Sequence, residues 1–323
     1  IWIVNILLTI VTLGIYSAWA KVRRMRYFYG CTFLVRHSFE YHARPLQILF
    51  GRIVALVIIV VYNVLVNVSP VAGGVAFVAL MLGYPFLVCR GIRFHARVSS
   101  YRNVRFDFAG GYGGALLAFL VGPFLALATL GLLAPVASRW NYRYLFGNLR
   151  YGGRPFDCRA RLGALYGVWV APALLVVIAL VATVVILFVA AYAGESYPGG
   201  GMSSAAFTAV FYLFGFTVFA AYGAAGFVYA AGARNVAFEA ARFDGRHDLD
   251  SDLGRRHYAW IAITNLVVTL LTFGLMRPWA AVRMARYVWS CTALKVEGNL
   301  GAYLSDLKDE TGVVGSEFME FEG

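Results

Sequence analysis

The chain has 323 residues, of which 61% are hydrophobic and only 14% charged, and its mean hydropathy is +0.70. Soluble globular chains carry about 25% charged residues, so this composition excludes a soluble enzyme, a disordered chain and a disulfide scaffold. It indicates a polytopic membrane protein. The formal charge is +12, but the basic residues stand in short segments between apolar blocks, which disfavours nucleic acid as a partner.

Gaps between charged residues predict four transmembrane helices. No charge occurs in 53–89, in 162–194 or in 196–233. A helix needs about 20 residues to cross a membrane, so the first gap must contain two helices and a turn, placed at Asn67–Pro70. The other two gaps form a second pair, with a turn at Glu195–Gly201.

Three further apolar runs belong to an internal repeat. The runs are 1–20, 108–138 and 257–276, and their repeat cores are about 5–34, 122–151 and 265–294. A shift of 260 positions aligns the first and third cores with thirteen identities over thirty positions, and a shift of 117 finds a weaker middle copy. We therefore expect one membrane domain, 1–304, with a threefold repeat, and a mobile acidic tail, 305–323.

Each copy has the same predicted local structure. The apolar helix ends at a Thr-Leu/Phe-Gly step, where glycine tolerates the left-handed backbone that ends a helix. A short amphipathic helix follows, beginning near Pro135 and Pro278 in the later copies. Trp19 and its basic neighbours fit the interface between lipid and water.

Segments of alternating aromatic and polar residues follow the basic helices and predict β structure. Examples run from Phe33 to His42, from Ile92 and Phe94 to Phe108, from Arg150 to Arg161 and from Val236 to Phe243. We expect small β-hairpins or a shared sheet against the membrane face, because an open sheet edge in the hydrocarbon is too costly.

The motifs resemble a known family. The stretch from Leu8 to Gly30, LTIVTLGIYSAWAKVRRMRYFYG, resembles the signature of the YjgN-like family of bacterial inner-membrane proteins, a domain of unknown function. Phe39–Ala43 and Arg277–Ala280 are similar to the same family, whereas Cys31 departs from the Asn expected there. The resemblance implies a bacterial plasma-membrane location and supplies no catalytic residue. The segment that normally precedes Ile1 in the family is absent from this sequence, so we expect that the natural N-terminus has been trimmed.

Basic residues suggest the orientation and leave two arrangements open. They fall into segments of 7, 5, 6, 5 and 5 residues, and the loops around Pro70 and Pro198 have none. Both loops should therefore lie outside the cytoplasm. If the three repeat helices cross the membrane, there are seven spans and the basic residues divide 17 to 11 between the faces. If they are re-entrant or broken, there are four spans and all 28 are cytoplasmic, the arrangement we favour.

The expected fold is thus an all-α integral membrane bundle, with four transmembrane helices, three repeat helices, small cytoplasmic β-hairpins and amphipathic helices. We find no catalytic constellation, no metal site and no cofactor motif, and therefore predict no enzyme. Intramembrane carboxylates, which ion-coupled transporters need, are missing from the predicted spans.

The cationic face suggests the function. The leading hypothesis is a channel, carrier or lipid-handling protein for an anionic solute or headgroup, with anionic phospholipids as partners. Candidate anion contacts are Arg23, Arg26, Arg143, Arg283 and Arg286, and the candidate intramembrane polar site is Asn5 with Asn265. For the arginines taken by themselves, anchoring to anionic lipid is the role that the sequence favours, and a phosphate site is the more specific hypothesis. The alternative function is a non-transporting scaffold that recruits partners through its β-rich cytoplasmic face.

Overall fold

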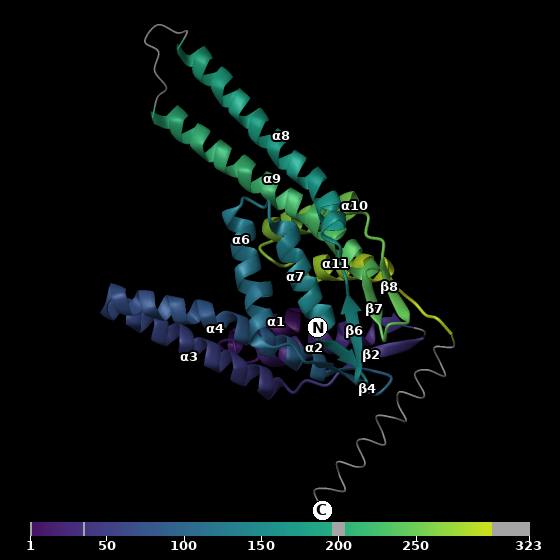
Figure 1. Cartoon of the computed structure of the whole chain (residues 1–323). Coiled ribbons are helices and arrows are strands. Elements are labelled where there is room, and N and C mark those ends of the chain that lie inside the picture. The colour runs from purple at the N-terminus through teal and green to yellow at the C-terminus, as the bar shows by residue number, and fades with distance from the viewer. Residues whose placement is uncertain (1, 35, 196–203, 299–323) are drawn as a thin grey trace, which may run out of the picture. The chain divides into compact units, whose positions relative to one another are not determined.

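The computed structural model describes residues 2–34, 36–195 and 204–298 (Figure 1). The predicted mobile tail, 305–323, lies outside these residues. The chain divides into two compact units, 1–159 with 241–249 and 294–323, and 160–240 with 250–293. The helices of the first unit are α1 (Trp2–Val11), α2 (Ser17–Gly30), α3 (Pro45–Val68), α4 (Pro70–Arg97), α5 (Tyr112–Leu116), the π-helical turn η1 (Leu117–Val121), α6 (Gly122–Ala128) and α7 (Ala134–Gly147). Those of the second are α8 (Leu162–Glu195), α9 (Ser204–Glu239), α10 (Arg255–Leu271) and α11 (Arg277–Ser290).

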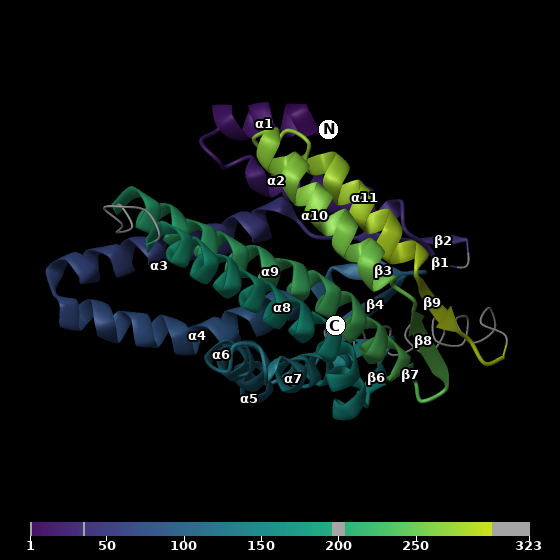
Figure 2. The same ribbon diagram turned by 90° about the horizontal axis from the view of Figure 1, so that it is seen from above.

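Four helices in the described part of the chain are long and apolar enough to cross a membrane, as the charge gaps predict. They are α3, α4, α8 and α9. The turn between α3 and α4 is at Ser69, whose hydroxyl accepts a hydrogen bond from the Val71 N–H, and Pro70 begins α4. The two helices run antiparallel, side by side (Figures 1 and 2). The turn between α8 and α9 lies outside the described residues.

The predicted hairpins join into one sheet. The strands are β1 (Phe33–Leu34), β2 (His37–Tyr41), β3 (Ser99–Tyr101), β4 (Val104–Phe108), β5 (Leu149–Tyr151), β6 (Arg154–Cys158), β7 (Ala241–Phe243), β8 (His247–Ser251) and β9 (Thr292–Lys295). They follow one another in the sheet in chain order, and each printed register from β1 to β8 is antiparallel. Of the two expected arrangements, small hairpins or a shared sheet, the structure has the shared sheet, because each hairpin's open edge is paired with the next hairpin. The expectation of an all-α fold class is thereby corrected.

Aromatic pairs connect neighbouring hairpins. One such pair lies across each of the joins β2–β3, β4–β5 and β6–β7. The pairs are Phe39–Tyr101, Phe106–Tyr151 and Phe156–Phe243, with ring centroids 4.9, 4.9 and 4.7 Å apart. Cross-strand aromatic pairs stabilise antiparallel sheets, so these three pairs contribute to holding neighbouring hairpins together.

Two segments predicted as strands are helical. Ile92 and Phe94 lie in α4, and Val236–Glu239 ends α9. In α4, Ile92 packs against the buried cluster that contains Phe108, and Phe94 packs against the buried cluster that contains Tyr41. A short apolar run fits either period, and here tertiary packing selects the helix.

The turn that ends each apolar repeat helix has the same geometry in all three copies. Leu13, Leu130 and Phe273 have φ of +48°, +50° and +49°, and the glycines that follow, Gly14, Gly131 and Gly274, have φ of +91°, +89° and +84°. In each copy the threonine hydroxyl donates to the preceding helical turn and accepts the N–H four residues later. The Thr-Leu/Phe-Gly step therefore reverses the chain between an apolar helix and a basic one.

Candidate functional site

In the third repeat copy, hydrogen bonds join the start of α10 to the last turn of α11. Gly254, directly before α10, donates its N–H to the Tyr287 hydroxyl at 2.9 Å, and its carbonyl accepts from the same hydroxyl at 3.3 Å. The Tyr287 ring lies edge-on to His257, 4.7 Å between centroids. Burial raises the pKa of Tyr287, and the hydrogen bond with the Gly254 backbone partly offsets this rise, so the hydroxyl stays protonated at neutral pH.

Arg283 of α11 is held in a fixed orientation by α10. Its Nη1 donates to the Thr264 hydroxyl at 2.7 Å and to Asn265 Oδ1 at 3.2 Å. Asn265 is buried, and its amide nitrogen donates to the Ala280 carbonyl at 3.0 Å. The guanidinium also lies 5.2 Å from the ring centre of Trp279, within cation–π range. Among the described residues, Nε and the second terminal nitrogen of Arg283 have no hydrogen-bond partner, which leaves donors for a ligand.

An open cleft of about 530 Å³ lies beside Arg283. Arg286, one turn further along α11, is exposed, also lines the cleft, and makes no hydrogen bond or ion pair with the described part of the chain. The full lining is His257, Ile261, Trp279, Val282, Arg283, Arg286, Tyr287 and Ser290. It contains two guanidinium groups and no carboxylate. Such a site attracts an anion, and the planar donors of arginine match the oxygens of a phosphate or carboxylate.

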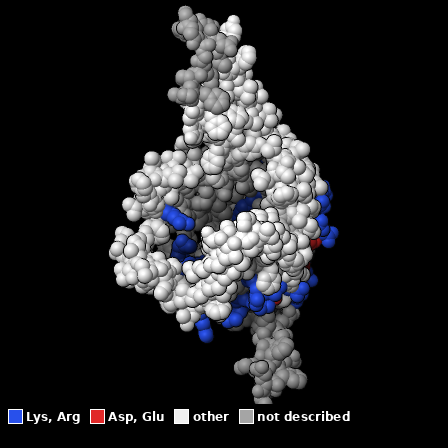
Figure 3. Space-filling model, turned by 90° about the vertical axis from the view of Figure 1, so that its left-hand side faces the viewer, with Lys and Arg blue, Asp and Glu red and all other residues white. Residues whose placement is uncertain are grey.

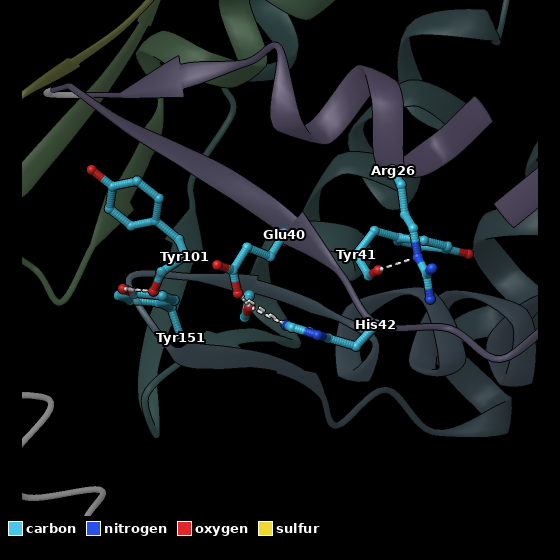
Figure 4. Close-up of polar contacts among 7 residues, drawn as sticks. Arg26, Glu40, Tyr41, His42, Tyr101 and Tyr151 are labelled. Atoms are coloured by element: carbon cyan, nitrogen blue, oxygen red, sulfur yellow. Dashed lines mark hydrogen bonds and ion pairs between the residues drawn. The ribbon is translucent and has the colours of Figure 1, made fainter. Parts of the chain in front are cut away.

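The first repeat copy arranges the equivalent residues differently. Asn5 is buried like Asn265, yet its Oδ1 has no partner among the described residues, and Arg23, at the position of Arg283, is exposed. Arg26 donates to the Tyr41 carbonyl at 3.4 Å (Figure 4) and to the Ala43 carbonyl at 3.5 Å. The Arg26 guanidinium thus holds the backbone at the end of β2 by hydrogen bonds.

In the second copy, small and aromatic residues replace the polar pair. Gly122 and Trp140 occupy the positions of Asn265 and Arg283. A Cβ at Gly122 would lie 3.2 Å from the Ala137 Cβ, so α6 and α7 approach too closely there for an asparagine. Arg143 is exposed on α7. Of the five predicted arginines, Arg283 and Arg286 therefore line one cleft, and Asn265 positions the first of them.

Several contacts of the site were missed by the sequence interpretation. Thr264, His257 and Ser290 carry no repeat signal, whereas Tyr287 does, since Tyr27 and Tyr144 align with it. The glycine partner also has an equivalent: Tyr144 donates its hydroxyl to the Gly111 carbonyl at 3.0 Å. Tyr144 and Gly111 lie 143 positions before Tyr287 and Gly254. The Tyr287–Gly254 contact could therefore have been found by extending the repeat alignment towards the N-terminus.

A second polar cluster lies at the join of β2 and β3. His42 Nε2 is 2.7 Å from the Ser100 hydroxyl and 3.2 Å from a Glu40 carboxylate oxygen (Figure 4). Both contacts use the same ring nitrogen, and Ser100 is 1% exposed, so this trio does not have the geometry of an activated nucleophile. No group of three metal-ligating side chains occurs in the part of the chain that the structure describes.

Basic side chains gather in groups on the face drawn in Figure 3, where little acidic surface is visible. Four ion pairs with arginine, such as Arg97–Asp107 at 2.9 Å, lie along the sheet. The arginines of the α10–α11 cleft have no such partner among the described residues, which leaves their charge available.

Comparison with known proteins agrees with the predicted family and location. Residues 1–321 match the family described as "Bacterial protein of unknown function (DUF898)". Inner membrane protein YjgN of Escherichia coli O157:H7 is 33% identical over 111 residues, which are 33% of this chain and 27% of that protein. YjgN of Salmonella typhimurium strain LT2 is 32% identical over 109 residues, 33% of this chain and 28% of the relative.

The match therefore spans less than a third of the length of these curated relatives. No solved structure matches the chain. The relatives are inner membrane proteins, and the four long apolar helices agree with the predicted inner-membrane location. Because the family match extends over nearly every residue, the chain belongs to this family of bacterial proteins of unknown function, the YjgN-like proteins.

Proposed function

We propose that this inner-membrane protein binds an anionic solute or headgroup in the cleft between α10 and α11, as part of a carrier, channel or lipid-handling activity. The observation that supports it most is the fixed guanidinium of Arg283, held by Thr264 and Asn265 with donors left over. A donor that is already oriented loses less conformational entropy when it binds a ligand. Arg286 adds a second positive charge to the same cleft.

The lining also fits an anion that carries an apolar part. Trp279, Ile261 and Val282 contribute apolar surface next to the two arginines. Ligand sites commonly combine such surface with a few placed polar groups. A free inorganic anion would use the guanidinium groups alone, whereas a lipid headgroup or an organic anion would use both parts.

The sheet supports a single membrane side for the basic segments. Seven spans would put the segment 90–105 and the segment 139–161 on opposite faces of the membrane. However, β4, which contains Arg105, pairs with β5, which contains Arg150, with Phe106 opposite Tyr151. Paired backbone of this kind does not extend through lipid as an open sheet. We infer four spans, with the basic segments and the sheet on the cytoplasmic face.

The lengths of the repeat helices agree with this topology. Helix α10 has 17 residues, which at 1.5 Å per residue is about 25 Å, less than the roughly 30 Å of hydrocarbon. In the middle copy, the apolar segment Tyr112–Ala128 is interrupted by the π-helical turn. Both features favour helices that enter the membrane without crossing it.

A binding experiment tests the proposal. The purified chain in detergent micelles is titrated with inorganic phosphate and with a water-soluble short-chain phosphatidylglycerol, and binding is followed by calorimetry. We expect saturable binding of at least one probe, weakened about tenfold or more in Arg283→Gln/Arg286→Gln, because each lost bond is to a charged group. Arg256→Gln, an exposed arginine of α10 outside the cleft, is the matched control and should bind like the parent chain.

Uptake into vesicles separates transport from binding. Proteoliposomes containing the chain are assayed for entry of whichever probe binds. If neither probe binds, or if the double variant binds as well as the parent, the cleft is not the site and the scaffold function becomes the better explanation.

A further inference from the structure

A second cationic site lies in the first unit, on helix α2. Ser17, Lys21 and Arg24 follow one another at intervals of four and three residues, which places them on one face of the helix. None of these residues lines the α10–α11 cleft. This face also differs from the repeat pattern, since Lys21 and Arg24 align with Ala281 and Met284.

Helix α3 adds a third positive charge to this face. Arg52 donates a hydrogen bond from its Nη1 to the hydroxyl of Ser17. Because Ser17 is one helical turn from Lys21, this contact holds the Arg52 guanidinium beside the Lys21 ammonium group. Three cations from two helices therefore converge on a small area.

The described residues supply no counter-charge for this cluster. Among the described residues, no carboxylate forms an ion pair with Lys21, Arg24 or Arg52. Burial, followed by repulsion from Arg52 and Arg24, lowers the pKa of Lys21. Like charges held together cost free energy unless an anion accompanies them.

A buried hydroxyl nearby also lacks a partner. Tyr41 is 4% exposed and packs with Ala18 and Val22 of α2, yet its hydroxyl makes no hydrogen bond within the described part of the chain. Figure 4 shows its ring pointing away from Glu40 and His42. Buried hydroxyls are nearly always hydrogen-bonded. The Tyr41 hydroxyl is thus an unused donor in the cluster that contains Ala18 and Val22 of α2.

Apolar surface continues from the cluster along α3. Leu56 and Ile59 follow Arg52 at intervals of four and three residues and are 63% and 60% exposed. A ligand bound at Arg52 would thus contact a cationic side chain at one end and a lipid-facing apolar stripe of α3 at the other. This pattern fits an amphiphile with a negative head.

We propose that Lys21, Arg24 and Arg52 bind the headgroup phosphate of an anionic phospholipid. The phosphate oxygens accept hydrogen bonds from the ammonium and the two guanidinium groups, and the acyl chains lie along α3. This site is independent of the anion cleft proposed for the third repeat, and either can exist without the other.

Native mass spectrometry of the full chain tests the site. The protein is titrated in detergent with dioleoyl phosphatidylglycerol and, separately, with zwitterionic dioleoyl phosphatidylcholine, and bound-lipid adducts are counted. The parent chain should prefer phosphatidylglycerol. Lys21→Gln/Arg24→Gln should weaken that binding about 25-fold, since each basic residue near a membrane contributes roughly fivefold. Arg105→Gln, an exposed arginine on β4, is the matched control and should change it less than about twofold.

Two further measurements identify the ligand and test whether the loss of binding is due to misfolding. Lys21→Arg/Arg24→Lys keeps both charges and should restore phosphatidylglycerol binding, whereas a merely unfolded variant would not be rescued. Excess inorganic phosphate that displaces the lipid would assign the site to the phosphate group itself; no displacement would assign it to the whole amphiphile. If Lys21→Gln/Arg24→Gln binds phosphatidylglycerol as tightly as the parent chain, the proposal is wrong.

Discussion

The Tyr287 hydroxyl and the backbone of Gly254 exchange two hydrogen bonds, at 2.9 and 3.3 Å, across 33 residues of sequence. Gly254 directly precedes α10 and Tyr287 lies within α11, so the pair fixes the start of one helix on the side of the other. A Cβ at Gly254 would lie 3.2 Å from the same hydroxyl, so a larger residue there would require the Tyr287 side chain to shift.

Replacing Tyr287 by Phe should therefore destabilise the protein. Both bonds are lost while the ring is kept, so we expect a loss of about 1–2 kcal/mol, measured as a lower apparent Tm in detergent micelles. Tyr27→Phe is the matched control, because Tyr27 occupies the same repeat position and is 51% exposed. Its hydroxyl makes no hydrogen bond with the described residues. Equal effects of the two substitutions would contradict the proposed role of the Tyr287–Gly254 contact.

The left-handed turn between the repeat helices makes a second prediction. Gly131 has φ of +89°, which an L side chain rarely adopts, although a Cβ there would meet no neighbour. Gly131→Ala should thus cost about 1–2 kcal/mol through backbone strain alone. Gly147, at the end of α7, has equally open surroundings and no positive φ. Gly147→Ala should change the apparent Tm little, and a similar loss at both positions would exclude strain as the cause.

The Arg97–Asp107 pair should make stability depend on pH. A hydrogen bond from Arg97, more than any other neighbour, lowers the pKa of Asp107 below its ordinary value of 3.8. A depressed carboxyl pKa stabilises the fold above the unfolded-state pKa, and this contribution is lost as pH falls through the folded-state value. Because both side chains are about half exposed or more, the effect should be at most about 1 kcal/mol.

Asp107→Asn isolates that contribution. We expect the parent chain to exceed the variant in apparent Tm by a constant amount above about pH 5. The difference should shrink as the pH falls below 3.8 and through the lowered folded-state pKa of Asp107. A difference that persists unchanged at the lowest pH would mean that the pair contributes through packing rather than charge.

The local parts of this fold could be predicted from sequence because they depend on neighbouring residues. The Thr-Leu/Phe-Gly turns need a left-handed glycine, and the α3–α4 turn needs Ser69 and Pro70 between two apolar runs. A shared sheet is one of the two expected arrangements, but the order and register in which the hairpins join could not be predicted in the same way. Both depend on backbone edges from distant segments, such as β4 and β5, meeting in register.

The roles of the arginines show the same limit. Arg26 and Arg283 lie in aligned basic segments, yet Arg26 donates to the carbonyls at the end of β2, and Arg283 is held beside a cleft. Arg93 repeats the first arrangement 67 positions later, with bonds of 3.2 and 2.9 Å to Phe108 and Gly110. Residue type gives the charge, but the nearby carbonyls and amides decide whether the charge is used within the protein.

The membrane topology can be decided by cysteine labelling. Cys31 is exposed, but Cys158, in the segment that matters most, is 2% exposed and would not react in the folded protein. Arg150→Cys, on the exposed side of β5, replaces it as the reporter, in a chain whose other cysteines are changed to serine. Val71→Cys, 75% exposed at the start of α4, reports the opposite side of the membrane.

With four spans, a membrane-impermeant maleimide should label Cys31 and Arg150→Cys from the same side, in inverted vesicles, and Val71→Cys only in intact cells. The pairing of Asp107 with Arg150 across β4 and β5 provides the control for folding. Cysteines at these two positions should be joined by a short bismaleimide, because directly opposed Cβ atoms are about 5 Å apart. Labelling of Arg150→Cys together with Val71→Cys would instead require α5–α6 to cross the membrane. The basic segments would then divide between two faces, and the cross-link between β4 and β5 could not form, so the two measurements together leave one arrangement standing.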